Sequence, residues 1–192
     1  MIRLGILGST RGTNMLALVD AINEGTLKAK IELVISNKPD AIILERAKSL
    51  GLNAQFVNPE GLNRIDFDKK VSDILINHQI DLIVLIGYMR ILSADFVNKW
   101  NNQVINVHPS LLPAFAGKMD IDVHQAVLDS GLKETGCTIH FVTEEVDAGP
   151  VILQKKCPVL EGDTAQTLKA RVQQLEGMAL VGAINLIASK GL

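Results

Sequence analysis

Short runs of apolar residues alternate with amphipathic stretches through the first half of the chain. The runs are apolar at nearly every position, which is typical of strands that helices cover on both faces. The predicted strands are Ile2–Leu7, Ile31–Ser36, Ala54–Val57, Leu82–Ile86 and Val104–Val107. The predicted helices are Asn14–Glu24, Ala41–Leu50, Arg64–His78 and Ala94–Trp100. This alternation predicts a doubly wound, mostly parallel α/β sheet.

The pattern changes in the second half of the chain. A long loop is expected over His108–Asp122, followed by a short helix over Val123–Ser130. The apolar runs Cys137–Val142 and Val151–Val159 predict two strands that pair antiparallel. A long final helix is expected over Thr164–Ile187, with Asp163 or Thr164 as its cap.

The charge balance argues against a polyanionic partner. The 19 basic and 21 acidic residues give a net charge of -2, so no overall basic field favours nucleic acid or an anionic membrane. No apolar run is long enough for a membrane span, and the N-terminus does not have the pattern of a signal peptide. Cys137 and Cys157 form no CxxC pair and are expected to be buried thiols in a reducing compartment. A cytoplasmic protein is therefore expected.

A glycine-rich segment, Gly8–Asn14, follows the first predicted strand and leads into a helix. Backbone N–H groups and the helix dipole at such a place favour an anion, typically phosphate. The segment has neither the GxGxxG nor the Walker spacing, and Ser36-Asn37-Lys38 puts no acidic residue at the end of the second strand. A dinucleotide is thus disfavoured. The alternative is a tight turn between strand and helix without a ligand.

A polar cluster follows the buried strand that ends near Val107. Strand alternation puts Asn106 and His108 on one side, at the carboxyl end of a parallel strand, where open α/β sheets bind ligands. An amide donor and an imidazole there could stabilise an oxyanion and transfer a proton. The alternative is a polar strand end that caps the turn before Pro109.

Asp147 lies in a turn-forming segment between the last two predicted strands, where carboxylates are usually solvated. If it came close to His108, it would raise the imidazole pKa and favour the protonated form. The four histidines show neither HxxxH nor HExxH spacing, so no metal site is expected.

The run Asn106-Val107-His108-Pro109-Ser110-Leu111-Leu112-Pro113 resembles the folate-dependent formyltransferases, in particular the branch that formylates 5-phosphoribosyl-glycinamide in purine biosynthesis. The resemblance extends over nearly the whole chain. It includes the glycine segment and Ser36-Asn37-Lys38, and the segments 87–93, 138–142 and 147–152. It implies a single Rossmann-like domain over 1–192, with a phosphate-binding half (1–100) and a catalytic and folate-binding half (101–192).

The resemblance also implies roles for particular residues. Asn106, His108 and Asp147 match the family's catalytic trio, and Gly12, Thr13 and Asn14 match its phosphate-binding segment. Glu176 matches a glutamate at the glycinamide end of the acceptor. The formylfolate site is matched by Arg64, Met89, Arg90, Ile91, Leu92, Val97 and Val146. The implied co-substrate is 10-formyltetrahydrofolate, without a metal, and the implied partners are small molecules, with the chain a monomer or homodimer.

Two segments depart from the family pattern. Gly177–Val181 stands where the family often has His-x-x-Tyr-Pro after the glutamate, which affects acceptor binding. Gly117–His124 is about three residues longer than the family's Gly-Leu-x-x-His run and is a candidate lid.

Three other functions share parts of this pattern. Methionyl-tRNA formyltransferase would be expected to add an RNA-binding domain and a basic surface, neither of which the sequence indicates. Formyltetrahydrofolate hydrolase shares the trio, but it would not need a phosphate segment and normally carries an N-terminal regulatory domain. A non-catalytic phosphate-binding module of the same architecture is the third alternative.

Overall fold

All seven strands belong to one sheet in the computed structural model, which describes residues 1–191. The strands are β1 (Ile2–Leu7), β2 (Ala29–Ser36), β3 (Ala54–Phe56), β4 (Leu82–Leu85), β5 (Val104–His108), β6 (Glu134–Phe141) and β7 (Val151–Pro158). Their order across the sheet is β3-β2-β1-β4-β5-β6-β7. β1 to β5 run parallel, whereas β6 pairs antiparallel with both β5 and β7.

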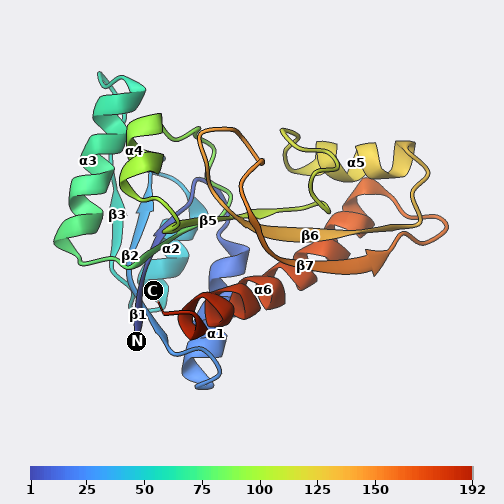
Figure 1. The fold of residues 1–192 in the computed structure, drawn as a ribbon, viewed down its shortest axis with the longest axis horizontal. Coiled ribbons are helices and arrows are strands. Elements are labelled where there is room, and N and C mark those ends of the chain that lie inside the picture. The colour runs from blue at the N-terminus through green and yellow to red at the C-terminus, as the bar shows by residue number, and fades with distance from the viewer. Residues whose placement is uncertain (192) are drawn as a thin grey trace.

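Helices cover both faces of this sheet. They are α1 (Thr13–Asn23), α2 (Ile42–Ser49), α3 (Arg64–Asn77), α4 (Ala94–Lys99), α5 (Ile121–Asp129) and α6 (Ala165–Ser189). Residues of α1, α2, α5 and α6 pack in one core cluster, and residues of α3 and α4 pack in another. In Figure 1, β6 and β7 extend away from the parallel strands, and α6 runs alongside them.

The period of two along each strand explains this double coverage. In β1, Leu4 and Ile6 point into the core beneath α1 and α6, whereas Leu7 points into the core beneath α3 and α4. β4 divides in the same way, because Leu82 and Val84 belong to the first cluster and Ile83 and Leu85 to the second. A strand buried on both faces must be apolar throughout, as the sequence shows.

The predicted fold class is confirmed, with shifts at some element ends. β6 begins at Glu134 rather than Cys137, because residues from Glu134 onward pair with the end of β7. α5 begins at Ile121, two positions before its predicted start. The cap of α6 is Thr164, whose hydroxyl accepts the N–H of Thr167, whereas the Asp163 carboxylate binds Arg171. The antiparallel pairing of the last two strands is as predicted.

β5 joins the parallel strands to the antiparallel pair, so the predicted halves 1–100 and 101–192 contribute to the same sheet. Residue 192 lies outside the described residues. Cys137 and Cys157 are buried free thiols, as expected. Within residues 1–191, no helix combines the length and the apolar character that crossing a membrane requires.

Candidate active site

Asn106 and His108 lie at the carboxyl end of β5, where the parallel part of the sheet ends. His108 is 3% exposed, and Asn106 is half-buried. In the antiparallel register between β5 and β6, Asn106 lies opposite His140 and His108 lies opposite Thr138. This register places a second imidazole beside the predicted pair.

Asp147 reaches this edge from the segment between β6 and β7. Its Oδ2 lies 3.3 Å from His108 Nδ1, and its Oδ1 lies 3.7 Å from His140 Nε2. The backbone N–H of Gly117 donates to Oδ2 at 2.8 Å. Asp147 has a left-handed backbone with φ 55°, a conformation that aspartate tolerates better than most residues. The fold thus brings the three residues predicted to be catalytic to one place.

The protonation of His108 depends mainly on burial. Burial lowers the pKa of His108, and this outweighs the opposing effects of the Asp147 carboxylate and the Phe115 carbonyl. The Asp147 carboxylate thus raises the His108 pKa, as expected, but burial has the larger effect. The sequence alone provides no measure of the cost of charging a buried ring. The lowered pKa favours the neutral ring.

His140 is a site residue to which the sequence assigned no role. Its Nδ1 lies 2.9 Å from the Phe141 carbonyl, which can only accept, so Nδ1 carries the ring proton. Burial lowers the pKa of His140, which leaves Nε2 as an acceptor at neutral pH. Nε2 is 3.3 Å from Asn106 Nδ2. His140 therefore fixes the orientation of the Asn106 amide and leaves one N–H of Nδ2 available for a ligand.

The sequence offered one signal that His140 could orient the Asn106 amide, namely its position one residue before the end of β6. Strand alternation shows which face His140 shares with its neighbours. It does not show that Asn106 is its partner across the sheet, because the register depends on the whole β5–β6 pairing.

The predicted phosphate segment lies at the start of α1. Gly12 is the N-cap residue, with φ 66°. A Cβ on Gly12 would lie 2.3 Å from Ile43 Cγ1, so the close approach of α2 requires glycine. Thr13 and Asn14 form the first turn of α1, where backbone N–H groups have no helical partners. The geometry suits an anion.

Glu176 of α6 lies beside this segment. Asn14 Nδ2 donates to Glu176 Oε2 at 2.8 Å. Burial raises the pKa of Glu176, whereas the Asn14 hydrogen bond and the Lys169 charge lower it. The next residue of α6 is Gly177, where a Cβ would lie 2.6 Å from the Cβ of Ala17 in α1. The departure from the family pattern at Gly177 thus permits the two helices to pack closely beside Glu176.

The residues predicted to bind formylfolate fall into two groups. Exposed side chains are those of Met89 (45%), Ile91 (59%) and Val146 (50%). Arg64, also exposed, is the first residue of α3. By contrast, Leu92 and Val97 are buried and belong to the core beneath α3 and α4.

The Arg90 side chain turns inward. Its guanidinium carbon lies 4.3 Å from the centre of the Phe67 ring in α3, a cation–π arrangement. The structure therefore presents two apolar side chains, Met89 and Ile91, on the outer side of the segment and holds Arg90 against the protein.

The longer loop predicted as a lid packs against the catalytic candidates. The Phe115 carbonyl lies 3.3 Å from His108 Nε2, and Gly117 donates to Asp147. Further along, Asp120 forms an ion pair with Lys169 of α6. The predicted lid Gly117–His124 thus contacts Asp147, and Phe115, two residues before it, contacts His108.

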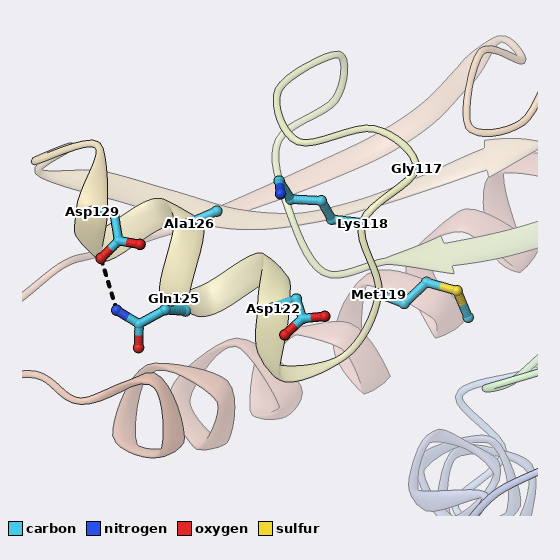
Figure 2. Close-up of a pocket in the computed structure, with 7 residues that line it drawn as sticks. All are labelled: Gly117, Lys118, Met119, Asp122, Gln125, Ala126 and Asp129. Atoms are coloured by element: carbon cyan, nitrogen blue, oxygen red, sulfur yellow. Dashed lines mark hydrogen bonds between the residues drawn. The ribbon is translucent and has the colours of Figure 1, made fainter.

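A cavity of about 470 Å³ lies on the outer side of this loop, against α5. Its lining residues are Gly117, Lys118, Met119, Asp122, Gln125, Ala126 and Asp129. Figure 2 shows Lys118 and Met119 leaving the loop in opposite directions, with Gln125 hydrogen bonded to Asp129 along α5. Gly117 also binds Asp147, so the cavity shares one residue with the catalytic candidates. No group of three or more His, Cys, Asp or Glu side chains within residues 1–191 is arranged to hold a metal ion.

Comparison with known proteins gives consistent matches. The sequence profile described as formyl transferase matches residues 2–184. The trifunctional purine biosynthetic protein adenosine-3 of Homo sapiens is 43% identical over 188 residues, which are 97% of this chain but 18% of that protein. The chain therefore spans about a fifth of that relative.

Two further relatives are similar in length to this chain. Phosphoribosylglycinamide formyltransferase of Haemophilus influenzae is 40% identical over 92% of this chain and 82% of its own length. The crystal structure of glycinamide ribonucleotide transformylase 1 from Symbiobacterium toebii superposes with a TM-score of 0.94 at 41% identity, covering 99% of this chain and 89% of that one.

Proposed function

Because the chain belongs to the formyl transferase family, we propose that it transfers the formyl group of 10-formyltetrahydrofolate to the amine of 5-phosphoribosyl-glycinamide in purine biosynthesis. One observation carries this proposal. His108 Nδ1 lies 3.3 Å from Asp147 Oδ2, and Asn106 lies two residues earlier on the same face of β5. The named activity of the Haemophilus influenzae relative supports the choice of acceptor.

The acceptor binds where α1 and α6 meet, with its phosphate end at α1 and its glycinamide end at α6. Its phosphate binds the N–H groups of Gly12, Thr13 and Asn14 at the start of α1, where the helix dipole favours an anion. Glu176, held by Asn14 at 2.8 Å, binds the glycinamide end. The two contacts orient the amine toward the formyl carbon, and orientation of this kind supplies much of the rate enhancement in a two-substrate transfer.

Formylfolate binds against the segment that follows β4. The exposed side chains of Met89, Ile91 and Val146 offer apolar contacts to its rings. The backbone of Arg90 and Leu92 supplies hydrogen-bonding groups, and Val97 supports the pocket from beneath. Arg64, at the start of α3, offers a positive charge to the folate carboxylates.

The reaction begins with neutral His108. The acceptor amine attacks the formyl carbon, the carbonyl oxygen becomes an oxyanion, and the free N–H of Asn106 Nδ2 donates to it. His108 takes the proton that the amine nitrogen loses, and Asp147 stabilises the resulting imidazolium. The proton then passes to N10 of the folate as the carbon–nitrogen bond breaks, which yields the formamide and tetrahydrofolate. No proton is gained or lost overall.

We also propose that the partners are small molecules, with no nucleic acid, membrane surface or metal ion taking part. Two buried thiols and a net charge of -2 support a cytoplasmic setting. A monomer and a homodimer both fit this chemistry.

Release of tetrahydrofolate, followed by absorbance with and without 5-phosphoribosyl-glycinamide, tests the proposed function. We expect release that requires the acceptor and saturates with it. Equal release without the acceptor would assign the chain as a formyltetrahydrofolate hydrolase. Phosphate binding without any release would assign it as a phosphate-binding module.

A further inference from the structure

The segment Gly87–Ser93, which carries the proposed formylfolate contacts, is tied to the protein by two buried polar side chains. The first is Ser9, at the end of β1, which is 3% exposed. Its hydroxyl accepts the N–H of Met89 at 2.9 Å and donates to Asn37 Oδ1 at 2.6 Å. Its own N–H donates to the Gly87 carbonyl at 3.0 Å. Ser9 therefore joins this segment to the glycine-rich segment proposed to bind phosphate.

The second buried side chain is Asp68 of α3, which is 1% exposed. Its Oδ2 accepts the N–H of Ser93 at 2.6 Å. Its Oδ1 has no hydrogen-bond partner within residues 1–191. A buried carboxylate costs free energy unless it is compensated, so an aspartate at this position needs a reason other than packing.

Between these two ties, the segment packs against α3. Arg90 stacks on Phe67, the residue next to Asp68. Burial raises the pKa of Tyr88, with a further rise from the nearby Asp68 charge and an opposing effect of Arg90. Met89 and Ile91, on either side of Arg90, point outward.

We propose that Ser9 and Asp68 are positioning residues for the formyl donor, holding residues 87–93 in the conformation that presents Met89 and Ile91 to the folate. The inference rests on the proposed function, and neither residue touches the folate itself. A binding segment fixed before the ligand arrives loses less conformational freedom on binding, so the affinity is higher.

The two residues have distinguishable effects. Asp68 binds only the far end of the segment, so its loss weakens formylfolate binding alone. Ser9 is continuous with Gly12 and Asn14 and also binds Asn37, so its loss weakens binding of both substrates.

Four variants test this inference: Asp68→Ala, Asp68→Asn, Ser9→Ala and the control Ser72→Ala. Ser72, also on α3 and buried, accepts a 2.9 Å hydrogen bond from Trp100 Nε1 away from the segment. The measurements are KM and kcat for each substrate, and calorimetric binding of 10-formyltetrahydrofolate without acceptor.

We expect Asp68→Ala to raise KM and Kd for formylfolate about tenfold, the effect of losing one buried hydrogen bond to a charged group. Asp68→Asn keeps an oxygen for the Ser93 N–H and is expected to restore most of the affinity. Ser9→Ala is expected to raise KM for both substrates, and Ser72→Ala to change each by less than about twofold. If Asp68→Ala does not fold, the serine variants decide the question.

Formylfolate binding by the unaltered chain, with the same constants in Ser9→Ala and Asp68→Ala as in the control Ser72→Ala, would overturn this inference alone. No formylfolate binding by the unaltered chain would overturn the proposed function, and this inference with it.

Discussion

Asn14 of α1 donates a 2.8 Å hydrogen bond to Glu176 of α6, across 162 positions of the chain. The bond has an electrostatic consequence. Burial raises the pKa of Glu176, and the Asn14 N–H opposes this by stabilising the carboxylate. The contact therefore connects the proposed phosphate segment with the proposed glycinamide contact and favours the ionised form of Glu176.

Gly177 is expected to control this contact through helix spacing. Alanine normally stabilises a helix interior relative to glycine by about 1 kcal/mol. Here its Cβ would lie 2.6 Å from Ala17 Cβ, so Gly177→Ala is expected instead to destabilise the protein by roughly 1–3 kcal/mol and to raise KM for the acceptor about fivefold. Urea unfolding and steady-state kinetics measure the two effects.

The matched variant for Gly177→Ala is the double change Ala17→Gly with Gly177→Ala, which removes the clash. It is expected to recover the acceptor KM, while KM for formylfolate changes little in either variant. An acceptor KM that does not respond to Gly177→Ala would contradict the idea that helix spacing positions Glu176.

Asn106→Ala removes the amide proposed to donate to the oxyanion. Loss of one such donor is expected to lower kcat about 10²- to 10³-fold, or about 3–4 kcal/mol. Single-turnover formyl transfer is the suitable measurement, because it reports the chemical step. The exposed Asn98, which binds Glu144, supplies a control in Asn98→Ala. Undiminished turnover in Asn106→Ala would remove this residue from the mechanism.

Asp147→Asn is expected to change the pH profile. In the mechanism above, neutral His108 accepts a proton, so kcat/KM falls as pH drops through the His108 pKa, below the usual value of 6.5. The Asp147 carboxylate raises that pKa, so its neutralisation shifts the acidic limb to lower pH. We also expect kcat to fall about 100-fold. A limb that stays in place or moves to higher pH would argue against the pairing.

Protein stability is expected to fall in mild acid because of buried histidines. Burial lowers the pKa of His124 from 6.5 to about 4, and its Nδ1 has no hydrogen-bond partner within residues 1–191. The unfolded chain then binds more protons than the folded one as pH falls from 6.5 toward 4. This difference costs about 2 kcal/mol between pH 7.5 and pH 5.

The pKa values of His108 and His140 are lowered in the same direction and add to this loss. Urea unfolding at the two pH values measures it. His124→Gln should reduce the difference. Equal stability at both pH values would contradict the inference that burial lowers the pKa values of these histidines.

The fold was largely predictable because its strands are buried on both faces. Runs such as Leu82–Leu85 are apolar at each position, and helices with a period of 3.6 separate them. The start of β6 was not predictable in this way. Glu134 to Gly136 are strand residues because β7 pairs with them, and polar side chains give no apolar signal for that pairing.

The candidate site was predictable in its residue types but less so in its geometry. Asn106 and His108 were identified from their place after a buried strand. The approach of Asp147 and the pairing of His140 with Asn106 depend on the path of β6 and β7, which one sequence does not specify. The lowered pKa of His108 depends on burial, which strand alternation alone does not quantify.

Asp68 illustrates a signal that was present but ambiguous. With Val71, Ser72 and Leu75 it lies on the buried face of α3, so its spacing points inward. In the sequence, however, a single carboxylate among charged neighbours indicates a solvated residue. The hydrogen bond from the Ser93 N–H becomes apparent only in the structure.

The most direct test of formyl transfer follows the carbon atom itself. The chain is incubated with 10-formyltetrahydrofolate that carries carbon-13 in the formyl group, together with 5-phosphoribosyl-glycinamide, and the product is identified by NMR. We expect the label to appear in the formamide of the acceptor. Label recovered as formate, or retained on the folate, would contradict it.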